Sequence, residues 1–248
     1  MDSNWLSDGS SKSGFTWEGG ETIDPDLRPR AVIGQPNFKA IWWLESALKA
    51  SRSVARIKFP DAAATGFLVG SDLLLTNHHV FENTADTVKA KVQFNYRMTV
   101  DEQLAQLDEW RCDPDAGFVT NPELDYSLVR LAPKNGKNAG DVWGTLDIKH
   151  EQMILPNSHV NIIQHPQGRF QEIAFRDNQV KLIDAVRIQY LTDTEFGSSG
   201  APVFDDWFNV IALHSQRVPD PGNPERWYRN EGFRVAAIVA DAPAFFPG

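Results

Sequence analysis

Three short segments of this 248-residue chain carry side chains that together could act on a carbonyl group. Residues 197–204 read GSSGAPVF, and Ser199 lies there among small residues just before an apolar stretch. Glycines at such a place let a substrate approach closely and let backbone N–H groups converge on a developing negative charge. Taken alone, however, a Gly-Ser cluster is more typical of an ordinary turn.

The second segment, GFLVGSDLLLTNHHVF at 66–81, brings His78 and His79 to the end of an apolar strand. A structural or surface pair explains them equally well when they are considered alone. A shared metal ion is not expected, because adjacent strand residues point to opposite faces and the other histidines show no ligand spacing. The third segment, LDYSLVRL at 124–131, places Asp125 before an apolar strand, where a solvated aspartate is the simplest reading.

Together the three segments contain the parts of a nucleophilic triad, in which a base takes the hydroxyl proton and a carboxylate orients the base. Their order along the chain is His79, Asp125, Ser199. This order is that of the chymotrypsin-like fold, and it differs from the orders in subtilisins and α/β-hydrolases. The nucleophile turn of an α/β-hydrolase also needs glycine at the position of Ala201, so an esterase of that fold is disfavoured.

The elements that must position these groups are mostly short strands. Alternating apolar and polar residues, or short apolar runs between turn residues, predict strands at 54–59, 66–70, 72–76, 88–96, 126–132, 159–164, 171–176, 180–191, 202–204 and 209–214. Many short strands with few helices indicate a sandwich or a barrel, not a βαβ protein.

Two helices are predicted. Residues 38–52 have Ile41, Leu44 and Leu48 at helical spacing, which predicts one amphipathic helix with these residues on its apolar face. The apolar segment 236–246 predicts a short helix that packs on the second half of the molecule.

Four segments are predicted to lack regular structure. Residues 1–36, rich in Ser, Gly, Asp and Pro, indicate a flexible or surface-draped arm, and 133–144 a linker between two β lobes. Residues 101–115 indicate a solvated excursion between strands, and 218–232 a long proline-rich loop beside the substrate pocket.

The composition limits the partners and the compartment. Lys and Arg number 24 against 33 Asp and Glu, a net charge of -9, so nucleic acid is not an expected partner. Cys112 is the single cysteine, which excludes an internal disulfide. The first residues lack a basic start and an apolar run, and the longest apolar stretch is too short to cross a bilayer, so we expect no membrane partner and a reducing, cytoplasmic compartment.

The segments TGFLVG, LTNHHV, LDYSLV and GSSGAPVF together resemble the trypsin-like serine peptidases. They are most similar to the bacterial branch that includes glutamyl endopeptidases and cytoplasmic trypsin-like modules, over residues of about 54–240. The resemblance implies an all-β fold: two six-stranded β-barrels, at about 53–135 and 145–240, with an N-terminal and a short C-terminal helix. The peptidase domain would then be 37–248, with its active site between the barrels.

The resemblance also implies the role of each residue. His79 would be the general base, Asp125 would orient it, and Ser199 would be the nucleophile. The backbone N–H groups of Gly197 and Ser199 would form the oxyanion hole. Ser198 stands where zymogens of the family have an aspartate that pairs with a new N-terminus, so we infer that activation does not use that ion pair.

The function implied is a serine endopeptidase that cleaves protein or peptide substrates through an acyl-enzyme, without a cofactor or a metal. Related modules act in bacterial signalling or defence, so a regulatory partner protein is a further expectation from the resemblance. The alternative is a peptide-binding module with the peptidase fold that is inactive until a partner or a cleavage remodels it.

Two signals for substrate choice oppose each other. Asp193 precedes the nucleophile by six residues, where trypsin keeps the carboxylate that selects basic residues. Thr194 and His214 match positions with which glutamyl endopeptidases hold an acidic side chain. Gln216 and Arg217 stand where the family has small residues and would narrow the pocket. The sequence leaves the specificity open, and all three of Asp193, Thr194 and His214 are candidate substrate-binding residues.

Overall fold

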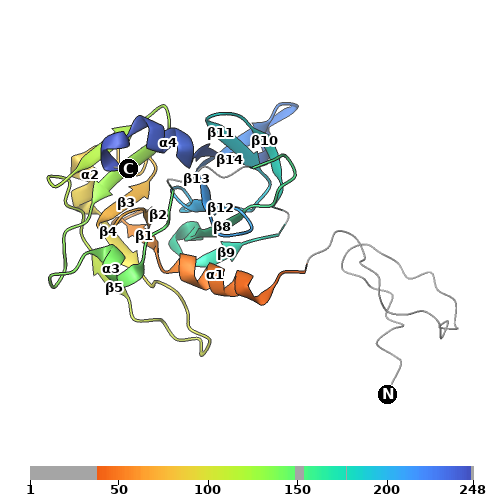
Figure 1. Ribbon diagram of the computed structural model, residues 1–248. Helices are drawn as coiled ribbons and strands as arrows, with labels where there is room; N and C mark the ends of the chain where they lie inside the picture. Colours follow the sequence, from red (N-terminus) through yellow and green to blue (C-terminus); the bar gives the residue numbers. More distant parts are fainter. Residues whose placement is uncertain (1–37, 149–153, 177, 247–248) are drawn as a thin grey trace, which may run out of the picture. The chain divides into compact units, whose positions relative to one another are not determined.

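The computed structural model describes residues 38–148, 154–176 and 178–246 (Figure 1). Its contacts divide the chain into Met1–Lys39 and Ala40–Gly248, and the fold described below is that of the second unit. The arm predicted at 1–36 lies outside the described residues and stays a prediction.

Two antiparallel sheets of seven strands each form this unit (Figure 1). The strands of the first sheet are β1 (Val54–Lys58), β2 (Ala63–Leu68), β3 (Leu73–Thr76), β4 (Lys91–Phe94), β5 (Asp108–Trp110), β6 (Phe118–Asn121) and β7 (Tyr126–Arg130). Their order in space is β5-β4-β1-β2-β3-β7-β6.

The second sheet repeats this plan. Its strands are β8 (Asn161–Gln164), β9 (Glu172–Ala174), β10 (Val180–Ile183), β11 (Arg187–Tyr190), β12 (Pro202–Phe204), β13 (Val210–Asp220) and β14 (Asn223–Arg234). Their order in space is β10-β11-β14-β13-β12-β8-β9.

Hydrogen bonds beyond the strand ends complete a ring of six strands in each sheet. In the first sheet, the chain after β5 returns to β7, where the Asp113 N–H donates to the Arg130 carbonyl (2.7 Å). In the second, the chain before β8 meets the chain before β10, where the Val160 N–H donates to the Asn178 carbonyl (2.9 Å). The two predicted six-stranded barrels are therefore confirmed, with β6 and β9 as a seventh strand in each.

Three clusters of buried apolar side chains hold the barrels together. One fills the first barrel and includes Ile57 and Phe94. A second fills the other barrel and includes Ile162. The largest contains residues of both barrels, among them Phe67 and Phe204, so apolar burial fixes one barrel against the other.

The predicted N-terminal helix is present as α1 (Ile41–Ser51), but its predicted apolar face was wrong. Ile41, Leu44 and Leu48 are 72%, 53% and 67% exposed, whereas Trp43 and Ala50 are buried. The same helix offers two apolar stripes. The stripe that contains Trp43 and Ala50 packs on the protein. Its large indole buries apolar area, and its small alanine lets the helix approach the barrel closely.

The C-terminal helix, α4 (Val235–Asp241), packs against β13 and β14 as predicted and ends before Pro243. Its last residue also reaches the first barrel. The Asp241 carboxylate accepts hydrogen bonds from the Tyr126 hydroxyl (2.5 Å) and from the Asn121 amide (2.8 Å). The helix therefore joins both barrels on the side where Figure 1 draws it in dark blue.

The strand predicted at 88–96 was too long at its start. Residues Thr84–Lys89 form the helix α2, because the Asn83 side chain accepts a hydrogen bond from the Asp86 N–H and caps its first turn. Val88 is 73% exposed as a result, and only β4 keeps the extended conformation.

Two hairpins replace other expectations. The strand predicted at 180–191 is the hairpin of β10 and β11, because the Asp184 carboxylate accepts the N–H groups of Val186 and Arg187 and turns the chain. The loop predicted at 218–232 was wrong, since these residues continue β13 and β14 as a long hairpin.

Two smaller expectations also need correction. The excursion at 101–115 contains β5, and the linker at 133–144 contains the short helix α3 (Ala139–Trp143). In α3 the Asn138 and Asp141 side chains bond each other's backbone as a capping box, a signal that the linker prediction overlooked.

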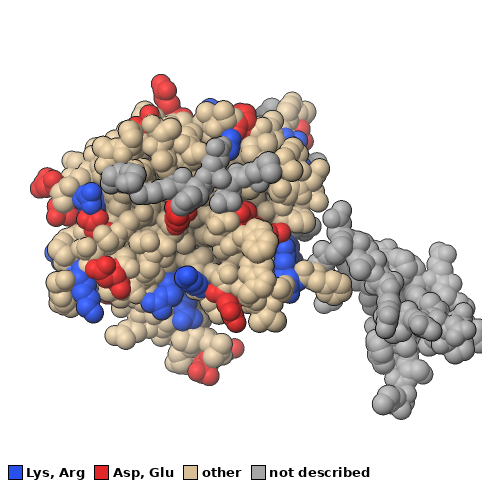
Figure 2. All heavy atoms as spheres, viewed as in Figure 1, with Lys and Arg blue, Asp and Glu red and all other residues tan. Residues whose placement is uncertain are grey.

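Charged side chains of both signs are interspersed on the face drawn in Figure 2, without a continuous basic patch in the part that is described. No helix within the described residues has the length and apolar character needed to cross a bilayer.

The packing of α1 gives a test of which face holds it. Trp43 lies 5.1 Å from Phe208, ring centre to ring centre, within the largest core cluster, whereas Trp42 stacks on the exposed Trp207 at 4.8 Å. We expect Trp43→Ala to lower the free energy of unfolding by about 3–5 kcal/mol, and Trp42→Ala by about 0.5–1.5 kcal/mol. Urea unfolding measures both, and equal losses would contradict this packing.

Candidate active site

A histidine and an aspartate from the first barrel meet in the cleft between the barrels. His79 follows β3, and its Nδ1 atom lies 3.0 Å from both carboxylate oxygens of Asp125, which precedes β7. The His79 N–H also donates to Asp125 Oδ1 (3.2 Å). Because the Nδ1 edge faces Asp125, Nε2 lies on the opposite edge of the ring, where it is available as a proton acceptor.

The second barrel adds a further bond to the same carboxylate. The Ser215 hydroxyl, from β13, donates to Asp125 Oδ2 at 2.6 Å. Burial by itself raises the pKa of the Asp125 carboxyl, but the bonds from His79 and Ser215 outweigh this and hold the pKa below its usual value. Asp125 is therefore ionised at neutral pH and keeps His79 in one orientation.

The backbone at Asp125 is held in an uncommon conformation. Its φ angle is 42°, in the left-handed region that aspartate tolerates better than most residues. The Asn77 amide donates to the Asp125 carbonyl (2.9 Å), and the Asn121 side chain accepts two N–H groups of the preceding turn. These bonds fix the position from which the carboxylate reaches His79.

Ser199 lies in a tight loop before β12. Two positions of this loop accept only glycine. Gly197 has a φ angle of +90°, and a Cβ there would lie 2.7 Å from the His165 carbonyl oxygen. Gly200 has a φ angle of +83°, and a Cβ would lie 2.1 Å from the Thr65 carbonyl oxygen. The small residues of the GSSG segment are therefore required by close backbone approach.

The same loop presents two N–H groups without partners. Among the described residues, the N–H groups of Gly197 and Ser199 donate no hydrogen bond. The carbonyl of Phe196 accepts a hydrogen bond from the Gln167 N–H. Since the C=O and N–H of a trans peptide point in opposite directions, this bond aims the Gly197 N–H away from Gln167. Two donors near Ser199 suit an oxyanion.

Thr65 of β2 connects this loop to the first barrel. Its N–H donates to the Ser199 carbonyl (2.9 Å), and its hydroxyl donates to the Gly197 carbonyl (2.8 Å). The same hydroxyl accepts the His165 N–H (3.0 Å). Thr65 is fully buried, so these bonds are shielded from water.

Two cavities meet at His79 and Ser199, and these two residues line both cavities. The first cavity, of about 690 Å³, is lined also by Thr194, His214 and Arg217. The second, of about 850 Å³, extends along the β1–β2 hairpin and the start of α2. The structure thus brings the three predicted residues into one cleft, although the Ser199 hydroxyl makes no hydrogen bond to any described residue.

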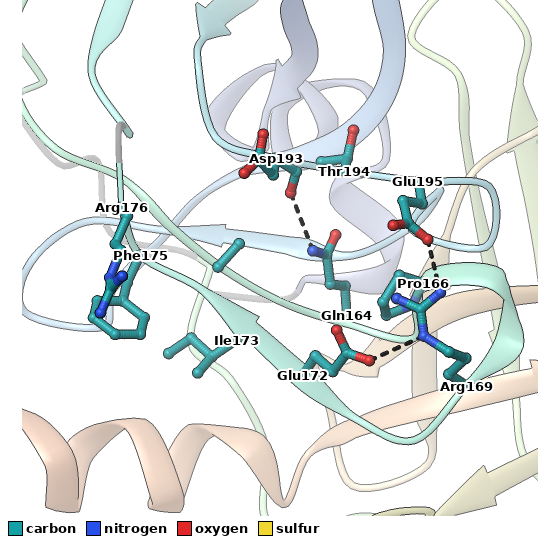
Figure 3. A pocket seen from close by; sticks show the side chains of 11 residues that line it. Gln164, Pro166, Arg169, Glu172, Ile173, Phe175, Arg176, Asp193, Thr194 and Glu195 are labelled. Atoms are coloured by element: carbon teal, nitrogen blue, oxygen red, sulfur yellow. Dashed lines mark hydrogen bonds and ion pairs between the residues drawn. The ribbon is translucent and has the colours of Figure 1, made fainter. Parts of the chain in front are cut away.

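Asp193 lies away from that cleft. It lines a separate cavity of about 250 Å³ that does not contain Ser199 (Figure 3). There the Gln164 amide donates to the Asp193 carbonyl (3.1 Å), and Arg169 bridges Glu172 and Glu195. Asp193, the candidate specificity carboxylate, therefore lines a different cavity from the one beside Ser199.

Thr194 and His214 line the cavity beside Ser199. The Tyr190 hydroxyl lies 2.8 Å from His214 Nδ1, and burial holds the pKa of His214 at about 3. His214 is therefore uncharged at neutral pH. The Thr194 hydroxyl donates to the Asn230 side chain (2.8 Å).

The charged residues that line this cavity are two arginines, Arg187 and Arg217, and the carboxylates of Glu123, Asp125 and Glu195. The Arg217 guanidinium stacks on Phe196 at 5.2 Å and that of Arg187 on Phe233 at 5.5 Å. Neither forms an ion pair with a described carboxylate. Arg187 was not singled out from the sequence, because the hairpin that places it was predicted as one strand.

Sequence reasoning also missed Ser215 and Thr65. Ser215 directly follows His214 at an irregularity of β13, where the register with β14 shifts, and its hydroxyl bonds to Asp125. Thr65 begins the TGFLVG segment, but only the tertiary fold brings it to the nucleophile loop. His165, in the turn after β8, is buried.

Comparisons with known proteins agree with this geometry. A family model for the trypsin-like peptidase domain matches residues 64–213. The uncharacterized protein y4fB of Sinorhizobium fredii (strain NBRC 101917 / NGR234) is 32% identical over 267 residues, which cover 90% of this chain and 40% of y4fB. A glutamyl endopeptidase of Staphylococcus aureus (strain MW2) is 25% identical over 168 residues, covering 64% of this chain and 48% of that protein. The chain spans less than half the length of either relative.

Solved structures share the fold. A Glu endopeptidase in complex with MPD superposes with a TM-score of 0.59 at 18% identity, covering 79% of this chain and 90% of that one. Deg5 superposes with a TM-score of 0.59 at 15% identity, with the same coverage of both chains.

The bonds of Thr65 can be tested by a change that keeps its shape. Thr65→Val removes the hydroxyl and leaves the His165 N–H and the Gly197 carbonyl without this partner, at about 1–3 kcal/mol for each. We expect the free energy of unfolding to fall by at least about 2 kcal/mol. Thr65→Ser keeps the hydroxyl and serves as the control. Equal stability of the valine and serine variants in urea would contradict the role of these bonds.

Proposed function

Because the chain belongs to the trypsin-like peptidase family, we propose that it is a serine endopeptidase that cleaves through an acyl-enzyme. The observation that carries the proposal is the cleft itself. An ionised Asp125 holds His79 beside Ser199, and two unpartnered N–H groups adjoin the same serine.

The proposed reaction uses these groups in sequence. His79 takes the Ser199 hydroxyl proton as the oxygen attacks the carbonyl carbon of the peptide bond. The carbonyl oxygen gains the negative charge and accepts the N–H groups of Gly197 and Ser199. His79 then gives the proton to the leaving amine. Water, activated in the same way, releases the acyl group from Ser199.

The bond between Ser199 and His79 would form when the substrate is bound, since catalytic hydrogen bonds are often long in the free enzyme. Asp125 and Ser215 act before that step, because they hold the imidazole so that a small movement brings Nε2 to the serine oxygen.

The nucleophile can be tested with a fluorophosphonate probe. We expect the wild-type protein to be labelled at Ser199, Ser199→Ala not to be labelled, and His79→Ala to react roughly 1,000-fold more slowly. Mass spectrometry of the labelled peptide identifies the serine. Ser71→Ala, in the β2–β3 turn, is the control and should react as the wild type.

The alternative, a peptide-binding module with this fold, makes the opposite prediction. The unbonded Ser199 hydroxyl of the free protein is the observation that favours it. A folded protein that binds peptides but is never labelled at Ser199 would support the alternative and overturn the enzyme. A role in bacterial signalling or defence, with a regulatory partner, rests on the resemblance and remains a prediction.

We further propose that the residue on the acyl side of the cut is acidic. Asp193 lines another cavity, while Arg187 and Arg217 line the cavity beside Ser199 and form no ion pair within 4 Å with its carboxylates Glu123, Asp125 and Glu195. A carboxylate would pair with a guanidinium in a partly enclosed site, where charge-assisted hydrogen bonds are strong. The name of the Staphylococcus aureus relative, a glutamyl endopeptidase, supports the same choice.

This specificity is tested with matched peptides that carry Glu or Gln before the cut. We expect kcat/KM for Glu to exceed that for Gln by about 10-fold or more, and Arg217→Ala to reduce the ratio toward one. Arg176→Ala is the control, because it removes an arginine that stacks on Phe175 beside the other cavity.

The pH dependence of that ratio identifies the charge. A guanidinium group in general keeps its charge from pH 6 to 9, and His214, with a pKa of about 3, stays neutral over the same range. The preference for Glu should therefore be constant over this range. A preference that falls as the pH rises would instead assign the recognition to a protonated histidine.

A further inference from the structure

The cavity on the other side of the nucleophile differs in its charged residues, because it contains carboxylates without an arginine. It adjoins His79, Val80 and Ser199 and continues between the β1–β2 hairpin and α2. Its charged lining residues are Asp61, Glu82 and Asp86, and it has no lysine or arginine in its lining. The arginine-lined cavity and this acidic one therefore meet at Ser199.

Two of the three carboxylates are unpaired. Asp86 forms an ion pair with Lys89 (3.0 Å) within α2, which offsets its charge. Asp61 and Glu82 are exposed and bond to no described side chain. Lys58, at the end of β1, donates to the Pro60 carbonyl (3.4 Å) and not to Asp61.

The same cavity has an apolar floor. The rings of Phe59 and Phe196 and the small side chains of residues 62–64 line it beside the carboxylates. An elongated apolar surface that ends in negative charge fits a side chain with a hydrocarbon stem and a cationic head. Phe196 already accepts the Arg217 guanidinium on its ring, which shows that a cation can stack there.

We propose that this cavity binds the leaving-group side of the substrate and selects lysine or arginine directly after the cut. The proposal rests on the proposed endopeptidase function and names the substrate class more closely. Together with the arginine-lined cavity, it makes the preferred site a junction between an acidic residue and a basic one.

Acyl transfer measures this cavity separately from the other one. The acyl-enzyme is formed from one ester substrate, and added amino-acid amides compete with water for it. The amine nitrogen attacks the acyl carbonyl carbon and loses a proton to His79, and the Ser199 oxygen leaves and regains its proton. The ratio of amide product to acid product reports binding of the amine in the leaving-group cavity.

The amines are arginine amide, citrulline amide and glutamate amide. Citrulline has the shape of arginine without its charge, so the ratio of the two isolates electrostatic recognition. We expect arginine amide to capture the acyl group about 5-fold better than citrulline amide, and glutamate amide to be the poorest, as two nearby carboxylates in a solvated cleft allow. Raising NaCl from about 50 to 500 mM should reduce the arginine preference.

The double variant Asp61→Asn/Glu82→Gln should abolish the preference for arginine over citrulline. The control is Asp101→Asn/Asp115→Asn, which removes the same charge from two exposed residues that line none of the cavities described above. The control should keep the wild-type ratio.

The outcomes separate this proposal from the function on which it rests. An acyl-enzyme that transfers equally to arginine and citrulline amides overturns the proposed selectivity and leaves the endopeptidase intact. A double variant that keeps the wild-type ratio also overturns it. Failure to form any acyl-enzyme from esters overturns both.

Discussion

The hydrogen bonds of Thr65 are the constraint on which the cleft depends. A peptidase site assembled from two barrels needs one contact that fixes the nucleophile loop against the barrel that carries the base. Thr65 supplies it, because its backbone and hydroxyl bond to Ser199, Gly197 and His165 in a fully buried position. Gly200 packs directly on the same residue, so no side chain separates the loop from β2.

The turn after β8 completes this support from the second barrel. The Gln167 N–H donates to the Phe196 carbonyl, and the peptide geometry then directs the Gly197 N–H away from Gln167. The Ser198 hydroxyl accepts the Glu195 N–H (3.1 Å) and closes the loop locally. Neutral hydrogen bonds therefore hold the loop at Ser198.

Charge is distributed across the cleft in a way that the net charge does not indicate. The whole chain is acidic, at -9, yet one cavity beside Ser199 is lined by Arg187 and Arg217. The other is lined by carboxylates, of which Asp61 and Glu82 lack partners. Since electrostatic selection acts over short distances in salt, the local arrangement decides the substrate and the total does not.

The sequence predicted most strands and both helices at the ends of the fold, because period-two alternation and turn residues are local signals, whereas the two barrels were implied by the resemblance to the trypsin-like peptidases. It also predicted that His79, Asp125 and Ser199 belong together. It failed where a local signal had two meanings: the stripe of Ile41 and Leu48 proved exposed, and residues 218–232 proved to be a hairpin. In the first case packing against distant residues such as Phe208 decided which face of the helix is buried, and in the second the pairing of β13 with β14 extended both strands.

By itself, then, the sequence determined the fold class, the order of the chemical groups and the absence of an internal disulfide, all of which follow from residue type and spacing. Only the tertiary structure placed Asp193 outside the cleft and brought Arg187, Ser215 and Thr65 to it. The physical reason is that a pocket is made by side chains far apart in the chain, and their directions depend on barrel closure and hairpin register.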